Sequence, residues 1–268
     1  MSTQSPPTSG YAEFNHLLGQ FKPIGLAQMD AVALLDRVDT KYVLRTTQLY
    51  AALTTLRNDY RVLEIDGARL HPYRTLYFDT DDFALYMRHH AGRQHRYKVR
   101  SRQYVDSQRS FLEVKVKTNK YRTSKQRIET GDLVTWWTPE ASRFIAAATP
   151  LNAEALEPKL WNSFVRITLV NQRQPERLTL DLNMHFDDGR DSLCLPGMAI
   201  AEVKQDGLDR NSAFVRQMRT MTIASTGFSK YCVGAALLYP QLKHNNFKDK
   251  LRLVEKLTGD DSHVYGPH

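Results

Sequence analysis

The chain has 268 residues, and 41% of them are hydrophobic, which is enough for a packed core in one large or two small domains. Its formal charge of +8, from 37 Lys and Arg against 29 Asp and Glu, indicates an anionic partner. Cys194 and Cys232 lie far apart in unlike contexts, so neither a disulfide framework nor a zinc site is indicated, and a reducing cytoplasm is expected. The N-terminus lacks a signal-peptide pattern and no run is long enough to span a membrane, so we expect a cytoplasmic protein without membrane insertion.

The order of patterns along the chain predicts one domain over 21–258, between a disordered polar tail over 1–20 and a short tail over 259–268. A helix over 27–37 and a strand over 37–44 come first, followed by a helix that Thr46 or Thr47 caps. The further expected elements are strands at about 60–65, 73–79, 162–171, 176–184 and 199–205, and helices from Thr80, over 139–148, from Asp209 to about Met221, and over "SKYCVGAALLYP" and "FKDKLRLVEKL".

The region 94–129 alternates so regularly that it predicts three long strands. Successive side chains of a strand point to opposite faces, so Leu112 and Val114 of "FLEVKVKT" share one face and Glu113 and Lys115 share the other. Between Arg93 and Arg127 there are twelve Lys and Arg against two acids, so the polar faces of this region are strongly cationic. The cationic side chains predicted to share these faces are Arg96, Lys98, Arg100, Arg102, Lys115, Lys117, Lys125 and Arg127.

The other strands repeat this arrangement, with cations on one side and apolar residues on the other. Their polar faces carry Arg37, Asp39, Lys41, Arg166, Thr168, Arg177, Thr179, Asp181, Glu202 and Lys204.

About eight strands, mostly joined as hairpins and accompanied by helices, predict an α+β fold built on an antiparallel eight-stranded β-barrel with helices packed outside. If helices cover the apolar faces, the cations line the interior of the barrel. Burying unpaired cations costs on the order of several kcal/mol each, so such an interior must be wet and must bind an anion with many charges. A string of phosphates fits, because Arg and Lys both bind phosphate oxygens. The alternative is that these are solvated faces of an open sheet.

Three carboxylates stand among the cations: Glu113, Asp181 and Glu202. They are either partners in internal salt bridges or ligands of a divalent ion. Mg²⁺ or Mn²⁺ needs only one or two carboxylates when water and phosphate oxygens complete its coordination. Glu202 is the strongest candidate of the three.

Several short motifs, in order along the chain, resemble the VTC domain, the polyphosphate polymerase domain of the vacuolar transporter chaperone complex, which belongs to the triphosphate tunnel metalloenzymes, the CYTH-like superfamily. The resemblance covers roughly 35–240, and each motif alone is weak. The motifs are "DTKYVL", "YRTLYFDT", "RYKVRSRQY", "FLEVKVK", "KQR", "FVRITL", "RLTLDLN", "AEVK" and "FSKY".

The resemblance implies an eight-stranded tunnel in which a nucleoside triphosphate, ATP, gives its terminal phosphate to a growing polyphosphate chain, with Mn²⁺ or Mg²⁺ bound at Glu202. For the strand "RYKVRSRQY", the match is ambiguous by two residues among Arg96, Lys98, Arg100 and Arg102. The residues expected to act in catalysis are Lys41, Arg100, Lys115, Arg166, Arg177 and Lys230. Those expected to bind substrate are Arg74, Arg96, Lys98, Arg102, Lys117, Lys125, Arg127, Lys204 and Ser229.

Two departures from the family's pattern are visible. Phe164 stands where the related eukaryotic polymerases have Tyr, and Arg37 stands where the hydrolytic relatives have an acid. The second departure reduces the number of acids that could bind a metal ion, which favours a polymerase over a hydrolase.

A phosphohydrolase that cleaves triphosphate or polyphosphate, and a non-catalytic polyphosphate-binding module, remain as alternatives. Nucleic acid is not expected as a partner, because the cationic region lacks stacking aromatics on the same face: Tyr97 and Tyr104 fall on opposite faces. A separate membrane protein that receives the product is left open.

Overall fold

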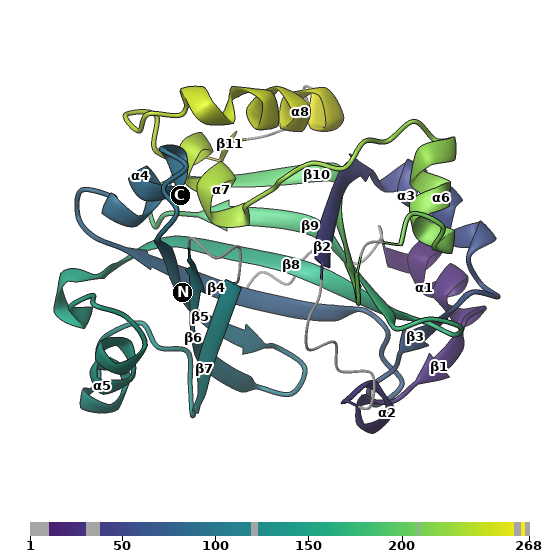
Figure 1. Ribbon diagram of the computed structural model, residues 1–268, viewed down its shortest axis with the longest axis horizontal. Helices are drawn as coiled ribbons and strands as arrows, with labels where there is room; N and C mark the ends of the chain where they lie inside the picture. The colour runs from purple at the N-terminus through teal and green to yellow at the C-terminus, as the bar shows by residue number, and fades with distance from the viewer. Residues whose placement is uncertain (1–10, 31–37, 119–122, 208, 260–263, 266–268) are drawn as a thin grey trace. The chain divides into compact units, whose positions relative to one another are not determined.

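The computed structural model of the protein describes residues 11–30, 38–118, 123–207, 209–259 and 264–265 (Figure 1). These residues form two compact units. Unit 1 takes its residues from Met1–His71, Arg166–Leu182 and Gly197–Gly227. Unit 2 takes its residues from Pro72–Val165, Asn183–Pro196 and Phe228–His268.

The strands form a large, mostly antiparallel sheet, and the fold is α+β as predicted. The hydrogen-bonded order is β11-β10-β9-β8-β4-β5-β6-β7, with β2 on β10, β3 on β8, and β1 parallel to β3. In the described part of the chain the order therefore has two ends, where the sequence predicted a closed ring. The strands are β1 Lys22–Ile24, β2 Val38–Arg45, β3 Tyr60–Leu63, β4 His71–Asp79, β5 Arg96–Tyr104, β6 Arg109–Lys117, β7 Thr123–Thr130, β8 Glu157–Asn171, β9 Glu176–Asp187, β10 Ser192–Gln205 and β11 Val264–Tyr265.

Eight α-helices lie within the described residues. None of these helices combines the length and the apolar composition that crossing a membrane requires. The helix α5 has the predicted bounds because Pro139 stands at its first turn and the Thr138 hydroxyl accepts a hydrogen bond from the Ala141 N–H at 3.2 Å. The helices are α1 Ala12–Gly19, α2 Leu26–Asp30, α3 Thr46–Thr55, α4 Ala84–His90, α5 Pro139–Ala148, α6 Ala213–Thr220, α7 Lys230–Leu238 and α8 Lys248–Thr258.

The N-terminal segment corrects one prediction. Residues 12–19 are the helix α1 and not part of a disordered tail, and Phe14, Leu17 and Leu18 on this helix are buried. The spacing of these three residues is that of one face of a helix. The polar residues between them make the segment as a whole look polar, so composition does not indicate the helix. Residues 1–10 lie outside the described residues. At the other end, the strand β11 lies within the tail predicted over 259–268.

The starts of α3, α4 and α6 differ from the predictions, and α4 begins at Ala84 and not at Thr80. Arg45, and neither Thr46 nor Thr47, is the N-cap of α3, and its N–H donates to the Gln48 side chain at 3.0 Å. Ser212 caps α6, so this helix starts later than Asp209. The helix expected over 27–37 is described only as α2, because residues 31–37, including Arg37, lie outside the described residues.

The core of unit 1 comes from alternate residues of its strands. Ile167 and Leu169 on β8 pack with Leu178 and Leu180 on β9, and residues of α1, α3 and α6 join the same cluster. The intervening residues of these strands therefore point to the opposite, polar face. On β10 the buried residues of this cluster are Ala199, Ala201 and Val203.

The core of unit 2 follows the same alternation. Leu112 and Val114 on β6 are fully buried with Val99 on β5, and Ala141 and Ile145 of α5 belong to the same cluster. The predicted division of "FLEVKVKT" into an apolar and a polar face is therefore confirmed. The register pairs Arg100 with Glu113 across β5 and β6, so the charged residues of neighbouring strands share one face.

The close packing of α7 gives a testable prediction for stability. A Cβ added at Gly234 would lie 2.5 Å from the Phe186 ring and 2.8 Å from a Leu160 methyl group, and both side chains are fully buried. Overpacking of this kind costs about 1–3 kcal/mol. Gly234→Ala should therefore lower the free energy of unfolding in urea by about this amount, in spite of the better helix propensity of Ala.

Gly131→Ala is the matched control, because a Cβ there meets nothing within 4 Å. Equal stability of the Gly234→Ala variant and the control would contradict the packing argument.

Candidate functional site

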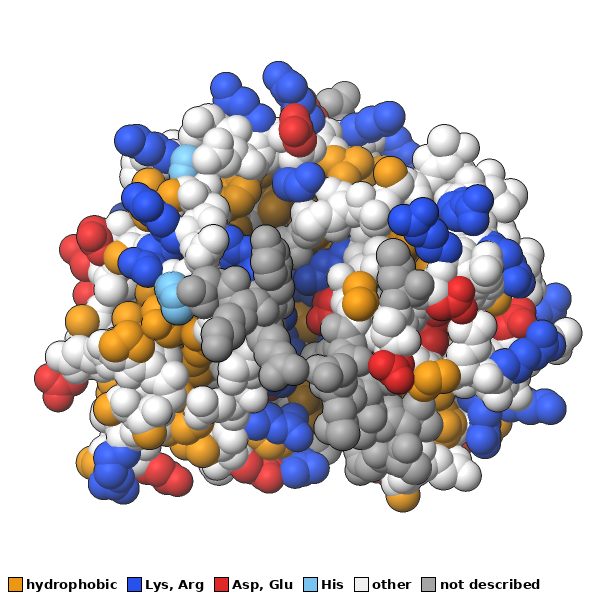
Figure 2. Space-filling model, viewed as in Figure 1, with side chains coloured by type: hydrophobic (Ala, Val, Ile, Leu, Met, Phe, Trp, Pro, Cys, Tyr) orange, Lys and Arg blue, Asp and Glu red, His pale blue; other side chains and the backbone are white. Residues whose placement is uncertain are grey.

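The polar face of unit 2 is formed by alternate residues of β4, β5, β6 and β7. The register places Tyr77, Arg100, Glu113 and Arg127 in one row across the four strands, and Lys98 and Lys115 in the next. Figure 2 shows many Lys and Arg side chains on the face of the molecule that it draws. The cations of the polar face of unit 2 are Arg96, Lys98, Arg100, Arg102, Lys115, Lys117, Lys125 and Arg127.

Glu113 lies among these cations and neutralises part of their charge. Its side chain is 2% exposed, accepts a hydrogen bond from Arg100 Nε at 2.6 Å and pairs with the Lys125 ammonium. Burial alone would raise the pKa of Glu113, but Arg100, Arg102 and Lys125 hold this pKa far below its usual value. Glu113 is therefore a permanent anion that fixes the position of Arg100.

Lys125 is a cation on this face whose charge depends on pH in the neutral to alkaline range. Partial burial, with Arg100 and Arg102 nearby, lowers its pKa to about 8, although Glu113 opposes the shift. Its side chain is 37% exposed, so it remains accessible to an anion from solvent.

The start of α7 carries two more predicted residues to this face. Ser229 caps the helix, and its hydroxyl accepts a hydrogen bond from Lys98 Nζ at 2.9 Å. The Lys230 ammonium lies 4.3 Å from the centroid of the Phe164 ring. Such a contact over an aromatic face holds a cation without neutralising it.

Tyr77 is a site residue that the sequence prediction missed. It is 3% exposed and lies opposite Arg100 on β4. Burial raises its pKa, but Arg100, Arg102 and Lys230 shift the pKa below the ordinary value for Tyr. Tyr77 could have been predicted from the two-residue period of "YRTLYFDT", because this period places Tyr77 on the same face as Tyr73 and Thr75.

Arg74 is not brought to this face, which corrects its predicted role in substrate binding. It alternates with Tyr73 and Thr75, so it shares the opposite face of β4 with Leu76. Its guanidinium lies 4.3 Å from the centroid of the Trp161 ring. Arg74 was predicted as a site residue because it belongs to the motif "YRTLYFDT". The alternation of side chains along β4 places it on the opposite face.

Unit 1 has a second cluster of charges on the polar faces of β2, β8, β9 and β10, which we call the polar cluster of unit 1. Arg166 forms a forked pair with Asp181, with distances of 2.6 and 2.8 Å. Glu202 pairs with Lys204 at 2.6 Å and with Lys41 at 3.3 Å. Lys204 also lies near Arg166 and Arg177, whose charges act to lower the pKa of Lys204.

The carboxylate of Glu202 is held ionised by its neighbours. Burial acts to raise its pKa, but Lys204 and Lys41 bring this pKa well below the usual value. Burial lowers the pKa of Lys204, and the charge of Glu202 opposes that shift. Glu202 is therefore an anion near neutral pH, and its charge favours the protonated form of Lys204.

The three predicted metal ligands are divided between the units, with Glu113 in unit 2 and Asp181 and Glu202 in unit 1. In the part of the chain that the structure describes, no three His, Cys, Asp or Glu side chains come together as a metal site. Asp181 and Glu113 have side chains 5% and 2% exposed, and each forms salt bridges with neighbouring cations. Glu202, with a side chain 18% exposed, fits a site with a single carboxylate in which phosphate oxygens and water supply the remaining ligands.

Comparison with known proteins places the chain in a family. The model of the VTC domain matches residues 36–239, which is more than half of the chain, and the chain therefore belongs to the VTC domain family. Membership of this family supports the assignment of the chain as a protein that binds and processes triphosphates. No curated protein matches the chain.

Several solved structures are similar to the chain at low sequence identity. A protein of Bacillus halodurans described as a putative adenylate cyclase is 14% identical, covering 76% of this chain and 97% of its own, with a TM-score of 0.47. A protein of Hippeastrum, described as a putative adenylyl cyclase with a dominant triphosphatase activity, is 14% identical, covering 74% of this chain and 96% of its own, with a TM-score of 0.44. A conserved hypothetical protein of Pyrococcus furiosus is 10% identical, covering 70% of this chain and 92% of its own, with a TM-score of 0.40.

The pKa of Lys125 predicts how anion binding depends on pH. Lys125 is charged below about pH 8 and loses its proton above it, so the affinity for tripolyphosphate should fall as the pH rises from 7 to 9.5. The loss of one partly exposed contact is worth about 1 kcal/mol, or roughly fivefold in affinity. Isothermal titration calorimetry measures the change directly.

Lys125→Arg is the control, because Arg keeps its charge throughout this range. Its affinity should stay level or rise, since the ligand gains negative charge as the pH increases. A fall as steep as that of the unmodified chain would show that Lys125 is not the titrating group.

Proposed function

We propose that the chain is a metal-dependent polyphosphate polymerase that transfers the terminal phosphate of ATP to a growing polyphosphate chain. The match to the VTC domain over residues 36–239 carries this proposal. The cations of both units support it, because most of the residues expected from the motifs lie on polar faces with Lys and Arg in excess.

The chemistry requires positioning and charge stabilisation more than covalent participation by the protein. In phosphoryl transfer, negative charge is spread over the oxygens of the transferred group, and Arg and Lys held in place stabilise it. Arg100 and Arg166 suit this role, because carboxylates fix their guanidinium groups before any substrate arrives. Lys115 is exposed, so its ammonium group is accessible to a phosphate.

The acceptor decides whether a general base is needed. A terminal phosphate oxygen is already ionised and can attack without losing a proton, whereas attacking water needs a base. The described carboxylates Glu113 and Asp181 are bound by cations and have low exposure, so they are poorly placed to deprotonate water. This arrangement favours phosphate as the acceptor over water.

Glu202 is the residue that we propose for holding Mn²⁺ or Mg²⁺. When bound, the ion would neutralise charge on the phosphates of the nucleotide. Glu202 would hold the ion, and Lys41 and Lys204 beside it would contact the phosphate oxygens.

One assay separates the alternatives. The purified chain is incubated with ATP and Mn²⁺, and the products are resolved as long phosphate polymer or as free phosphate. Polymer supports the proposal. Free phosphate without polymer identifies a phosphohydrolase, and the absence of both, with tripolyphosphate binding retained, identifies a binding module.

Glu202→Gln tests the metal role. The amide keeps the shape but loses the charge, so activity at a limiting Mn²⁺ concentration should fall by about 10- to 100-fold, a typical effect of perturbing a metal site. Glu255→Gln on the exposed face of α8 is the control and should keep full activity. Undiminished turnover of Glu202→Gln at every Mn²⁺ concentration would remove this residue from the site.

Lys115→Ala tests the role of the polar face of unit 2. Each phosphate contact releases bound counterions, so its loss should weaken tripolyphosphate binding and make the affinity less dependent on salt. The measurement is calorimetry at several NaCl concentrations, with Arg219→Ala, on the exposed side of α6, as the control. An equal, small loss in both variants would favour a diffuse surface patch over a site.

A further inference from the structure

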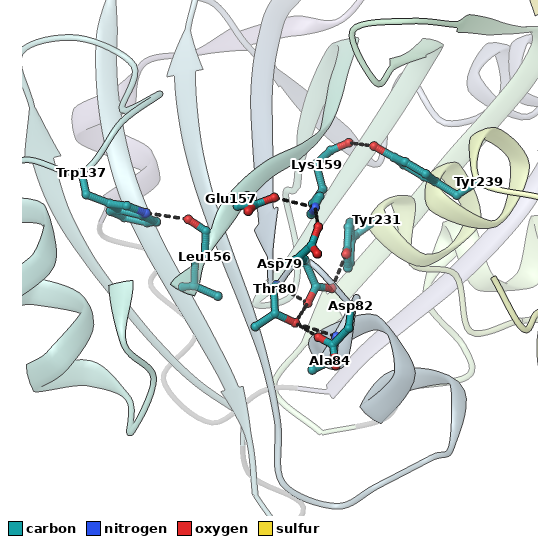
Figure 3. A network of polar contacts seen from close by, with 11 residues as sticks. Asp79, Thr80, Asp82, Ala84, Trp137, Leu156, Glu157, Lys159, Tyr231 and Tyr239 are labelled. Atoms are coloured by element: carbon teal, nitrogen blue, oxygen red, sulfur yellow. Dashed lines mark hydrogen bonds and ion pairs between the residues drawn. The ribbon is translucent and has the colours of Figure 1, made fainter. Parts of the chain in front are cut away.

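Asp79 is a buried carboxylate outside the charged rows described above. It ends β4, is fully buried, and accepts hydrogen bonds from five neutral groups, as Figure 3 shows in part. Three are the backbone N–H groups of Thr80, Leu85 and Tyr86, each at 2.8 Å, and the others are the hydroxyl groups of Thr80, at 3.4 Å, and of Tyr231. The carboxylate thus connects the end of β4, the first turn of α4 and the first turn of α7.

Tyr231 follows directly on two residues that reach the polar face of unit 2. Ser229 is the N-cap of α7 and accepts the hydrogen bond from Lys98, and Lys230 lies over the Phe164 ring. The ring of Tyr231 also contacts Tyr77, with centroids 5.2 Å apart. A change in the position of Tyr231 would therefore move the two side chains that precede it.

The energetics explain why this connection is rigid. A buried polar group that loses a hydrogen-bond partner costs about 1–3 kcal/mol, and more when it is charged. Tyr231 cannot leave Asp79 without leaving one carboxylate oxygen with fewer donors in a site that water does not reach. Neither residue lies among the cations, so their contribution to binding must pass through the residues they hold.

We propose that Asp79 and Tyr231 are positioning residues that hold Ser229 and Lys230 at the polar face of unit 2 for contact with a substrate phosphate. This inference rests on the proposed function, because it assumes that the polar face binds phosphates. It assigns a role to the Asp of "YFDT" and to the Tyr of "FSKY", which the cation pattern leaves unexplained.

The opposite end of the same helix offers a matched control. Tyr239 is the C-cap of α7, and its hydroxyl donates to the Lys159 carbonyl oxygen at 2.5 Å (Figure 3). Tyr239→Phe removes one tyrosine hydrogen bond from α7, as Tyr231→Phe does, but far along the helix from Ser229 and Lys230. Tyr239→Phe therefore measures how much affinity is lost when α7 loses a hydrogen bond at the end far from the proposed phosphate contact.

The experiment is a double-mutant cycle measured as tripolyphosphate affinity by calorimetry. Tyr231→Phe is made in the unmodified chain and in a chain carrying Ser229→Ala and Lys230→Ala, and Tyr239→Phe is made in both as well. Tyr231→Phe should weaken binding about five- to tenfold in the unmodified chain, corresponding to one charge-assisted contact. In the chain without Ser229 and Lys230 it should change affinity by less than about twofold, because coupled residues are not additive.

Tyr239→Phe should leave the affinity within about twofold in both backgrounds, even if it lowers the unfolding temperature. Should Tyr231→Phe fail to fold, Asp79→Asn replaces it in the same cycle and should give the same pattern.

Three results would overturn the inference. Equal weakening by Tyr231→Phe in both backgrounds would show a general structural role, and so would equal weakening by the two tyrosine variants. No weakening at all would show that the start of α7 needs no such anchor. If the unmodified chain does not bind tripolyphosphate, the proposed function is wrong and this inference is wrong with it. That result is distinguishable from the three above, because in those the unmodified chain binds tripolyphosphate.

Discussion

Repulsion between like charges held on one face of a sheet is the constraint on which the rest of the structure depends. The apolar residues of β5 and β6 must pack against the helix α5, so their intervening Arg and Lys have only the opposite face to occupy. The few acids on that face are placed where they reduce the repulsion most. Glu113 contacts Arg100 and Lys125, and in unit 1 Glu202 contacts Lys41 and Lys204.

The carboxylates also determine which cations are rigid. A guanidinium held by two oxygens, as Arg166 is by Asp181, has a defined direction, whereas the side chain of Lys115 is exposed to solvent. The protein thus combines cations that carboxylates hold in place with a cation that solvent reaches. This division suits the recognition of a repeating anion, in which one phosphate has to be aligned and its neighbours only attracted.

The faces of the strands could be predicted from the sequence because alternation depends only on the strand itself. The split of residues 111–117, the basic face of β5 and the alternation of Leu178 and Leu180 all agree with the structure. The partners of the acids could not be predicted in this way, because they depend on the register between strands. The sequence left Asp181 open between a salt bridge and a metal ion, and the pairing of β8 with β9 supplies Arg166.

The errors have physical causes of a similar kind. Arg74 entered the predicted site through a motif, although the apolar residues Leu76 and Phe78 mark its face as the buried one. The helix α1 was hidden because its apolar residues recur every three to four positions within a polar stretch. Arg45 is the N-cap of α3 because its N–H donates a hydrogen bond to the side chain of Gln48. Composition does not reveal a hydrogen bond of this kind.

The double pairing of Glu202 has a consequence for release. An anion that arrives at Lys41 and Lys204 competes with a carboxylate already in contact with both, so it gains only the difference between the two interactions. Under the proposed function, a phosphate would therefore be bound only weakly at this position. In a polymerase, weak binding would let the polymer advance by one unit after every transfer, whereas ammonium groups without a carboxylate partner would hold it more tightly.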